Sequence, residues 1–146
     1  MRQVHSRPQR DAFTLIEVLV VIVVIAILAS LVAPSLFRNV GDARMATART
    51  QIETFGTALD LYRLDNGSYP TSTQGLASLW QRPTSDPPPN WKSPYLRKAV
   101  PKDPWGRDYV YVSPGRVNPQ SYDLISYGAD GRPGGEGEDA DIVSWK

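Results

Sequence analysis

Oxygen-bearing side chains are the part of this sequence whose types and spacing could do chemistry. The stretch YGADGRPGGEGEDAD, residues 127–141, contains five acidic residues and five glycines. A hard cation such as calcium prefers carboxylate and carbonyl oxygens, and glycine lets the backbone curl until its carbonyls turn inward. The spacing is not that of an EF-hand. The composition therefore leaves two interpretations open, a calcium-binding loop and a solvated acidic loop without a metal.

Glu17 is a second acidic residue with unusual surroundings. It lies near the start of an apolar run, FTLIEVLVVIVVIAILASLVA, which occupies residues 13–33 and leads into Pro34. An unpaired carboxylate in hydrocarbon costs roughly a few kcal/mol, so a charge at this position calls for a partner.

The rest of the composition argues against catalysis and against nucleic-acid binding. The chain has no cysteine, and its one histidine, His5, lies close to the N-terminus. Beyond that residue, histidine-based triads, thiol nucleophiles and the commonest zinc sites are excluded. The formal net charge is +1, with acidic and basic residues interspersed, so no basic surface for nucleic acid is expected. We expect a structural protein rather than an enzyme.

The apolar run that carries Glu17 is long enough to span a membrane, since about 20 helical residues cover roughly 30 Å of hydrocarbon. Residues 1–12 carry three arginines against one aspartate, which favours a cytoplasmic N-terminus. Three interpretations compete: a retained anchor helix, a removable signal peptide with small residues at Ala29 and Ser30, and a buried core helix. Ile27 breaks the small-residue pattern before that cut, so we favour a retained helix.

Beyond Pro34 the helical pattern continues with one apolar face. Its apolar residues recur at spacings of three and four and comprise Met45, Ala48, Ile52, Phe55, Leu59 and Tyr62. This periodicity predicts an amphipathic helix over residues 35–64, continuous with the apolar run through a bend at Pro34. Asp65-Asn66-Gly67 predicts the end of the helix, because Asn and Gly tolerate the left-handed conformation of a C-cap.

Residues 65–107 are expected to be mostly loops. The stretch TSTQGLASLWQ predicts a short helix with Thr73 as its N-cap. Five prolines between Pro83 and Pro94 predict an extended, donor-poor connection.

The C-terminal third, residues 108–146, predicts a small antiparallel sheet. Alternating apolar and polar residues predict strands at 108–112 and 121–126, and a last short strand follows at 142–145. Aromatic residues on this sheet could form a stacking platform, but we favour packing against the helix. The aromatic residues concerned are Trp105, Tyr109, Tyr111, Tyr122 and Trp145.

The run FTLIEVLVVIVVIAILASLVAPSL resembles the N-terminal segment of type IV pilins and of the pseudopilins of type II secretion. The resemblance implies that a prepilin peptidase cleaves between Ala12 and Phe13 and methylates the new amine. Ala12 stands where the family usually has glycine. The new amine would lie four residues before Glu17, and in a polymer of packed helices one subunit's carboxylate can pair with a neighbour's amine. We hypothesise that Glu17 directs docking and register.

Further motifs narrow the resemblance to the major pseudopilins, the G subunits of type II secretion systems: TQGLASL, PYL, PKDPWGRDYVY, YDLISYGADG and GGEGEDADI. The resemblance implies an α+β, pilin-like fold, in which a long N-terminal helix packs on a small antiparallel sheet. It also implies a calcium ion in the C-terminal loop. Asp130 is the first implied side-chain ligand, Asp139 and Asp141 are alternatives for the distal one, and carbonyls near Tyr127 and Arg132 complete the shell.

The resemblance further implies a structural subunit that polymerises into a periplasmic pseudopilus and drives export of folded proteins across the outer membrane. Residues 1–12 are then a cleaved leader, residues 13–34 a membrane-spanning and polymer-core helix, and residues 35–146 a periplasmic domain. The expected location is the bacterial inner membrane, crossed once, and the periplasmic fibre after assembly.

The expected partners are further copies of the chain, minor pseudopilins, the inner-membrane assembly platform, the prepilin peptidase and, before assembly, membrane lipid. Nucleic acid is not an expected partner. Two alternatives stay open: a pilin of a type IV pilus for motility or DNA uptake, and a monomeric membrane-anchored periplasmic binding domain.

Overall fold

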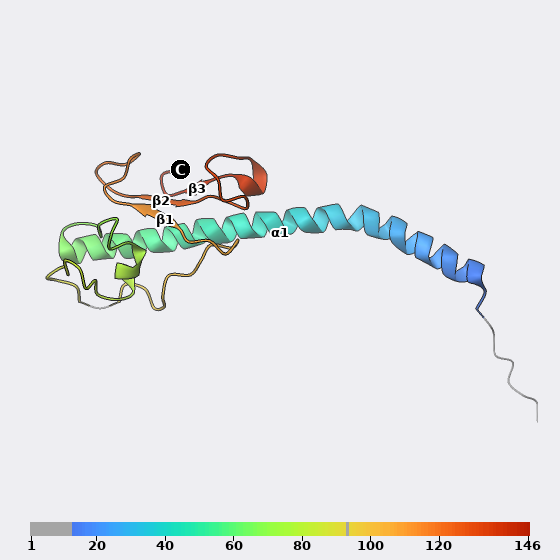
Figure 1. The fold of residues 1–146 in the computed structure, drawn as a ribbon, viewed down its shortest axis with the longest axis horizontal. Coiled ribbons are helices and arrows are strands. Elements are labelled where there is room, and N and C mark those ends of the chain that lie inside the picture. Colours follow the sequence, from blue (N-terminus) through green and yellow to red (C-terminus); the bar gives the residue numbers. More distant parts are fainter. Residues whose placement is uncertain (1–12, 93) are drawn as a thin grey trace, which may run out of the picture. The chain divides into compact units, whose positions relative to one another are not determined.

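The computed structural model describes residues 13–92 and 94–146. The chain divides into two compact units, of which the first ends at Asn39 and the second comprises Val40–Lys146. One helix, α1, runs from Leu15 to Asn66 and contributes to both units (Figure 1). It covers the apolar run and the amphipathic stretch, as the periodicity predicts, and it continues through Pro34.

Both ends of α1 are defined by local chemistry. At the start, the backbone N–H of Glu17 donates to the Thr14 hydroxyl oxygen at 3.3 Å, so Thr14 acts as the N-cap. At the end, Gly67 adopts a left-handed conformation with φ of 80°, and its N–H donates to the Arg63 carbonyl at 2.7 Å. This is the αL type of C-cap that the Asp-Asn-Gly sequence predicts.

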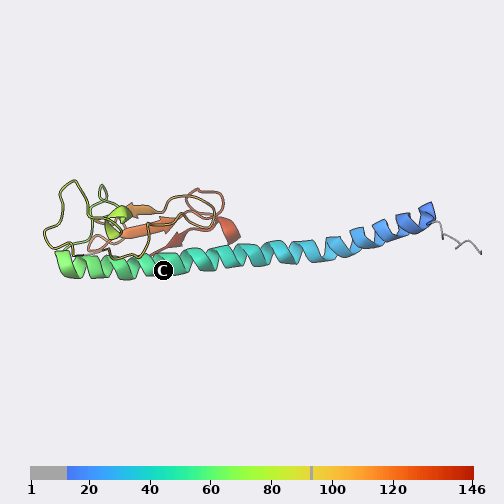
Figure 2. The ribbon, with the colours of Figure 1, turned by 90° about the horizontal axis from the view of Figure 1, so that it is seen from below.

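The second unit places a small sheet along one side of α1, in both views (Figures 1 and 2). The strands are β1 (Val110–Val112), β2 (Asp123–Ser126) and β3 (Ile142–Val143), and they form an antiparallel sheet in the order β1-β2-β3. Tyr111 pairs with Leu124, and Ser126 pairs with Ile142. The three strands confirm the predicted α+β fold, although each is shorter than the alternating pattern suggested.

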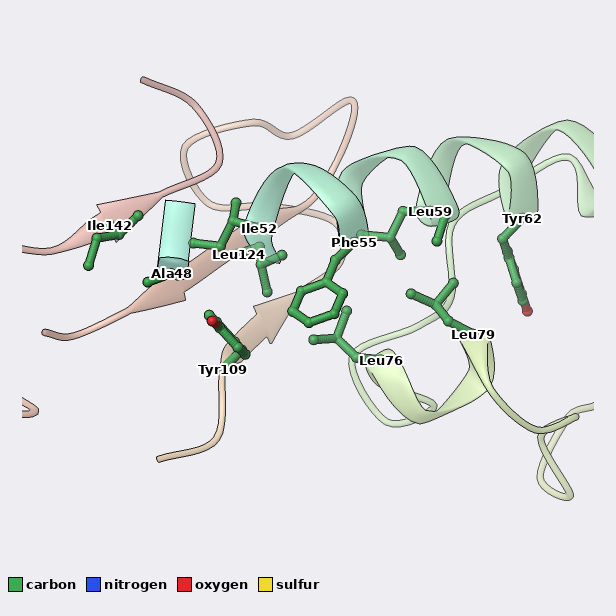
Figure 3. Close-up of a cluster of buried hydrophobic side chains, with 11 residues drawn as sticks. Ala48, Ile52, Phe55, Leu59, Tyr62, Leu76, Leu79, Tyr109, Leu124 and Ile142 are labelled. Carbon is green, nitrogen blue, oxygen red and sulfur yellow. The ribbon is translucent and has the colours of Figure 1, made fainter. Parts of the chain in front are cut away.

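The core of the second unit lies between α1 and this sheet (Figure 3). The predicted apolar face of the helix is buried there, with Met45 partly buried at its edge. The sheet contributes Leu124 and Ile142, and Tyr109 packs edge-on against Phe55 with ring centroids 5.2 Å apart. Side chains of this size contribute about 1.5–3 kcal/mol each when fully buried. The helix and the sheet therefore stabilise each other.

The aromatic residues near the sheet pack inward, which favours packing over a stacking platform. Tyr122 lies edge-on to Tyr69 at 4.9 Å and beside Tyr111 at 5.9 Å. The Tyr111 hydroxyl donates to the Pro70 carbonyl at 2.8 Å, and burial raises the pKa of Tyr111 well above its ordinary value.

The prediction of Thr73 as a helix N-cap is wrong. The structure has a single 3-10 turn, η1 (Leu76–Leu79), which begins after Gly75 and has no side-chain cap. Thr71 and Gln74 instead close the preceding turn reciprocally, with N-to-oxygen distances of 3.0 and 3.2 Å. Gly75, at φ of 61°, separates that turn from η1, because a left-handed residue interrupts helical hydrogen bonding.

The described residues of the proline-rich connection form no helix or strand, but they include bends at residues 84–86 and a turn at residues 89–90 rather than one extended run. The connection is attached to η1 and to the end of α1 by hydrogen bonds. The Trp91 indole N–H donates to the Ser78 carbonyl at 2.9 Å. The Lys92 ammonium contacts Asp65 at 2.5 Å, and this hydrogen bond lowers the pKa of the Asp65 carboxyl. The Tyr95 hydroxyl also donates to Asp65, at 3.2 Å.

Candidate functional site

Phe13, the predicted methylation site, and Glu17, one of two predicted assembly residues, lie just before α1 and in its first turn. Phe13 is outside the helix and 75% exposed, while Glu17 lies in the first helical turn. A carboxylate at this position interacts favourably with the partial positive charge of the helix N-terminus. Thr14 and Glu17 also form the Thr-x-x-Glu pattern of a capping box, a sequence signal that marks the start of the helix.

The apolar segment that follows is exposed along its whole length. Leu15–Val32 has a mean hydropathy of 3.2, and none of these residues is buried within the chain. A helix that is apolar all round is buried by lipid or by other helices. This exposure argues against the buried-core interpretation, because none of these side chains is covered by the part of the chain that the structure describes.

Two further predicted residues are Ala12, which precedes the cleavage site, and Pro34, the second predicted assembly residue. Ala12 lies outside the described residues. Pro34 lies within α1, in the stretch 33–38 whose side chains are outside the described part of the structure.

The acidic loop connects β2 to β3 and contains one 3-10 turn, η2 (Gly137–Asp139) (Figure 1). Its neck is closed by a hydrogen bond from the Ala129 N–H to the Glu138 carbonyl, at 2.8 Å. Gly128 makes this closure possible: it has φ of 59°, and a Cβ there would lie 2.6 Å from the same carbonyl oxygen. The glycine content thus reflects close backbone approach, as the composition suggested.

The first predicted ligands lie just beyond this neck. The Tyr127 carbonyl accepts a hydrogen bond from the Gly131 N–H at 3.1 Å. Asp130 is exposed, and its Oδ1 accepts the Arg132 N–H at 2.9 Å. Tyr127, Asp130 and Arg132 therefore belong to one tight turn, held by its own backbone.

The two alternatives for the distal ligand differ in their environment. Asp139 is exposed, and its N–H donates to the Glu136 carbonyl at 3.2 Å. Asp141 is half-buried: Oδ2 accepts the Gly134 N–H at 3.0 Å, whereas Oδ1 is buried and has no hydrogen-bond partner among the described residues. A buried carboxylate oxygen without a partner is costly, and a cation is one group that could satisfy it.

The described part of the chain contains no group of three or more acidic or histidine side chains arranged to hold a metal. Asp130, Asp139 and Asp141 are thus present on one loop without converging as a trio. A site built from two carboxylates and several carbonyls remains compatible with the preference of calcium for mixed oxygen ligands. Calcium stays a prediction.

Two residues that the sequence reasoning did not assign hold this loop in place. The Arg107 guanidinium donates to the carbonyls of Gly128 and Ala129, each at 2.8 Å. Asp103, which is 5% exposed, accepts the Arg107 N–H at 2.8 Å and the Ser126 hydroxyl at 2.7 Å. About twenty residues separate Arg107 from the loop, so no local sequence signal could have identified this contact.

Glu138 forms a third contact, between the loop and α1. Its side chain lies against Gly41, which is buried, so that a Cβ at that position would overlap the Glu138 carboxylate. Gly41 is an interior residue of α1, where a glycine ordinarily weakens a helix. In the structure it provides the space into which the loop docks.

Comparison with known proteins gives a consistent result over the whole length. Residues 35–145 match the family model described as "Type II secretion system (T2SS), protein G", and residues 7–33 match "Prokaryotic N-terminal methylation motif". The type II secretion system core protein G of Pseudomonas aeruginosa is 47% identical over 141 residues, covering 96% of this chain and 98% of that protein.

Two further comparisons agree. The type II secretion system core protein G of Vibrio cholerae is 47% identical over 137 residues, covering 94% of this chain and 92% of that protein. The crystal structure of the major pseudopilin from the type 2 secretion system of enterohaemorrhagic Escherichia coli matches with a TM-score of 0.63 and 38% identity. This match covers 77% of the present chain and 95% of the Escherichia coli chain.

Proposed function

We propose a function for this chain as a member of the type II secretion system protein G family, the major pseudopilins, to which it belongs. In this structural subunit the apolar helix anchors and assembles the protein, and the acidic loop binds calcium. The subunit polymerises into the pseudopilus that drives export of folded proteins. Its role is structural rather than catalytic. The observation that carries this function is the apolar Leu15–Val32 segment, which has no buried residue and which the described part of the chain leaves uncovered.

Membrane lipid covers this segment before assembly, and neighbouring copies of the same helix cover it afterwards. Leu15–Val32 is long enough to cross a bilayer once. This length supports a location in the inner membrane, with the Val40–Lys146 unit in the periplasm. Residues 1–12, with three arginines, stay on the cytoplasmic side until a prepilin peptidase removes them. A pilus pilin is not favoured, because the matching relatives are named as secretion proteins.

Glu17 sets the register of assembly. Cleavage after Ala12 frees an amine on Phe13, which lies outside the helix and is exposed. In a bundle of apolar helices, a carboxylate and an ammonium from adjacent subunits offset each other's desolvation when they are in contact. A subunit docked one turn out of place would leave both charges unpaired in an apolar environment.

The partners follow from this mode of assembly. Further copies of the chain form the fibre, minor pseudopilins join it, and an inner-membrane platform adds subunits at its base. The energy for assembly must come from a cytoplasmic motor, since the glycine-rich stretch Gly131–Gly137 lacks the Lys-Ser/Thr ending of a phosphate-binding loop.

The acidic loop is the proposed calcium site. Asp130 and Asp141 would supply carboxylate oxygens, with carbonyls of Tyr127 and Arg132 beside them. The uncompensated Asp141 Oδ1 supports this assignment over Asp139. A bound cation would join the two arms of the loop, a task that disulfides perform in other extracytoplasmic proteins and that a chain without cysteine must do otherwise.

Complementation of a strain that lacks this subunit tests the function. The wild-type chain should restore release of a folded exoprotein into the medium, and overexpression should give filaments that can be sheared and pelleted. Glu17→Ala should accumulate in the membrane without either activity. Glu53→Ala, which removes an exposed acid on the same helix, is the matched control and should behave as wild type. Normal filaments from Glu17→Ala would refute the assembly role.

Thermal unfolding of the full chain in detergent tests the metal. Calcium should raise the melting temperature by several degrees over the value in chelator, since a ligand that binds only the folded state stabilises it. Magnesium at the same concentration is the control. Identical melting curves with calcium and with chelator would remove the metal from the account.

A further inference from the structure

Arg107 holds the neck of the acidic loop through both arms of its guanidinium group. Nη1 donates to the Gly128 carbonyl and Nη2 to the Ala129 carbonyl, each at 2.8 Å. The rigid, planar fork of an arginine spans two neighbouring carbonyls in a way that a lysine ammonium does not. Ala129 is also the residue whose N–H closes the neck onto Glu138, so Arg107 acts where the two arms of the loop meet.

The backbone of Arg107 is itself held in place by Asp103. Its N–H donates to Asp103 Oδ1, and its carbonyl accepts the Asp103 N–H, each at 2.8 Å. The other oxygen of Asp103 accepts the hydroxyl of Ser126, the last residue of β2 and the second residue before Gly128. The buried Asp103 thus ties the turn that carries Arg107 to the strand that leads into the loop.

The loop leaves space for this side chain. Gly131 has φ of 70°, and a Cβ at that position would lie 2.5 Å from Nε of Arg107. Any other residue would have to displace the guanidinium or distort the turn that holds Asp130 and Arg132. The fit between Gly131 and Arg107 makes the arginine an integral part of the loop's conformation.

We propose that Arg107 is the positioning residue of the acidic loop: it holds the loop neck closed independently of a cation and so fixes where Asp130 stands. This inference rests on the proposed calcium site. The guanidinium holds the carbonyls of Gly128 and Ala129, and the proposed carbonyl ligands Tyr127 and Arg132 lie on either side of this pair in the sequence. It also places one positive charge beside a loop with five acids, which reduces their repulsion when no cation is bound.

Hydrogen exchange and calcium titration on the full chain in detergent test the proposal with Arg107→Gln and Arg107→Lys. In chelator, Arg107→Gln should speed amide exchange at Ala129 and Gly131 by about tenfold or more, because the loop loses two charge-assisted hydrogen bonds. Calcium affinity should fall by about 10- to 100-fold, the usual effect of removing a residue that orients metal ligands. Arg107→Lys should lie between that variant and the wild type.

Arg97→Gln, at an exposed arginine of the same unit, is the matched control and should change neither quantity. Exchange at Leu124, in the centre of the sheet, reports whether each variant is folded, and Arg107→Lys provides the measurement if Arg107→Gln is not. Unchanged exchange at Ala129 and Gly131 would overturn the role of Arg107, whatever the metal does. Failure of the wild-type chain to bind calcium would instead overturn the metal site. Faster amide exchange in Arg107→Gln would still support the role of Arg107 in holding the loop neck closed.

Discussion

The substitution Gly41→Ala has two opposite effects on the free energy of unfolding: a gain in helix propensity and a steric overlap with Glu138. Gly41 is an interior residue of α1, where alanine is ordinarily better than glycine by about 0.5–1 kcal/mol. The added Cβ would, however, lie 2.5 Å from Cγ of Glu138 and closer still to the carboxylate. Glu138 must then leave its place on the helix, although its carbonyl also closes the neck of the acidic loop.

Overpacking of a close contact costs about 1–3 kcal/mol, so the steric effect should exceed the gain in helix propensity. We expect Gly41→Ala to lower the free energy of unfolding by about 1 kcal/mol. In a Glu138→Ala background the obstacle is absent, and the same change should raise stability by about 0.5–1 kcal/mol. The coupling between the two positions should therefore be about 1.5–2 kcal/mol, within the range for residues in contact.

Denaturant unfolding of the full chain in detergent, followed by tryptophan fluorescence, measures this coupling, since all four tryptophans lie in the second unit. Glu136→Ala is the matched background, because it removes an exposed acid of the same loop. Gly41→Ala should remain destabilising there. Equal effects of Gly41→Ala in the Glu138→Ala and Glu136→Ala backgrounds would show that the loop does not dock on Gly41.

Two further perturbations have clear expected outcomes. Asp141→Asn should abolish the rise in melting temperature that calcium produces, while Asp139→Asn should keep most of it. The reason is that Asp141, unlike the exposed Asp139, has a buried oxygen without a hydrogen-bond partner among the described residues. The reverse order would assign the ligand to Asp139. Burial raises the pKa of Tyr122 from 10.0 to about 12, with Asp60 adding to the shift. The stability that this neutral phenol contributes is therefore present below pH 10 and is lost as the pH rises toward 12, so Tyr122→Phe should flatten the decline of melting temperature over that range. A slope equal to that of the wild type would count against this assignment.

The elements that repeat a simple pattern were predictable from the sequence. The buried stripe of α1, its end at Gly67 and the three strands follow from periodicity and turn residues, which act over a few neighbouring positions. The prediction of Thr73 as an N-cap was wrong because η1 begins only after Gly75, whose positive φ separates it from the preceding turn. The preference of threonine for cap positions gives no information about this backbone conformation.

The architecture of the loop was not predictable in the same way. Its acids and glycines indicated oxygen ligands and close backbone approach, and Asp130 and Arg132 do share one turn. The hydrogen bonds from Arg107 to the loop and the contact of Glu138 with Gly41 join positions that are distant in the chain. Such contacts depend on how the sheet packs on the helix. A local sequence pattern can therefore indicate the residue types but not which residues come into contact.

Assembly depends on the Glu17 carboxylate, which would be enclosed by apolar helices in the fibre and would pair there with the terminal amine of another subunit. A helical reconstruction of filaments from the overexpressed chain measures this directly. We predict that the chain begins at Phe13 and that its amine lies within about 4 Å of the Glu17 carboxylate of an adjacent subunit, a salt-bridge distance. A filament whose subunits begin at Met1, or in which Glu17 faces solvent, would contradict the account.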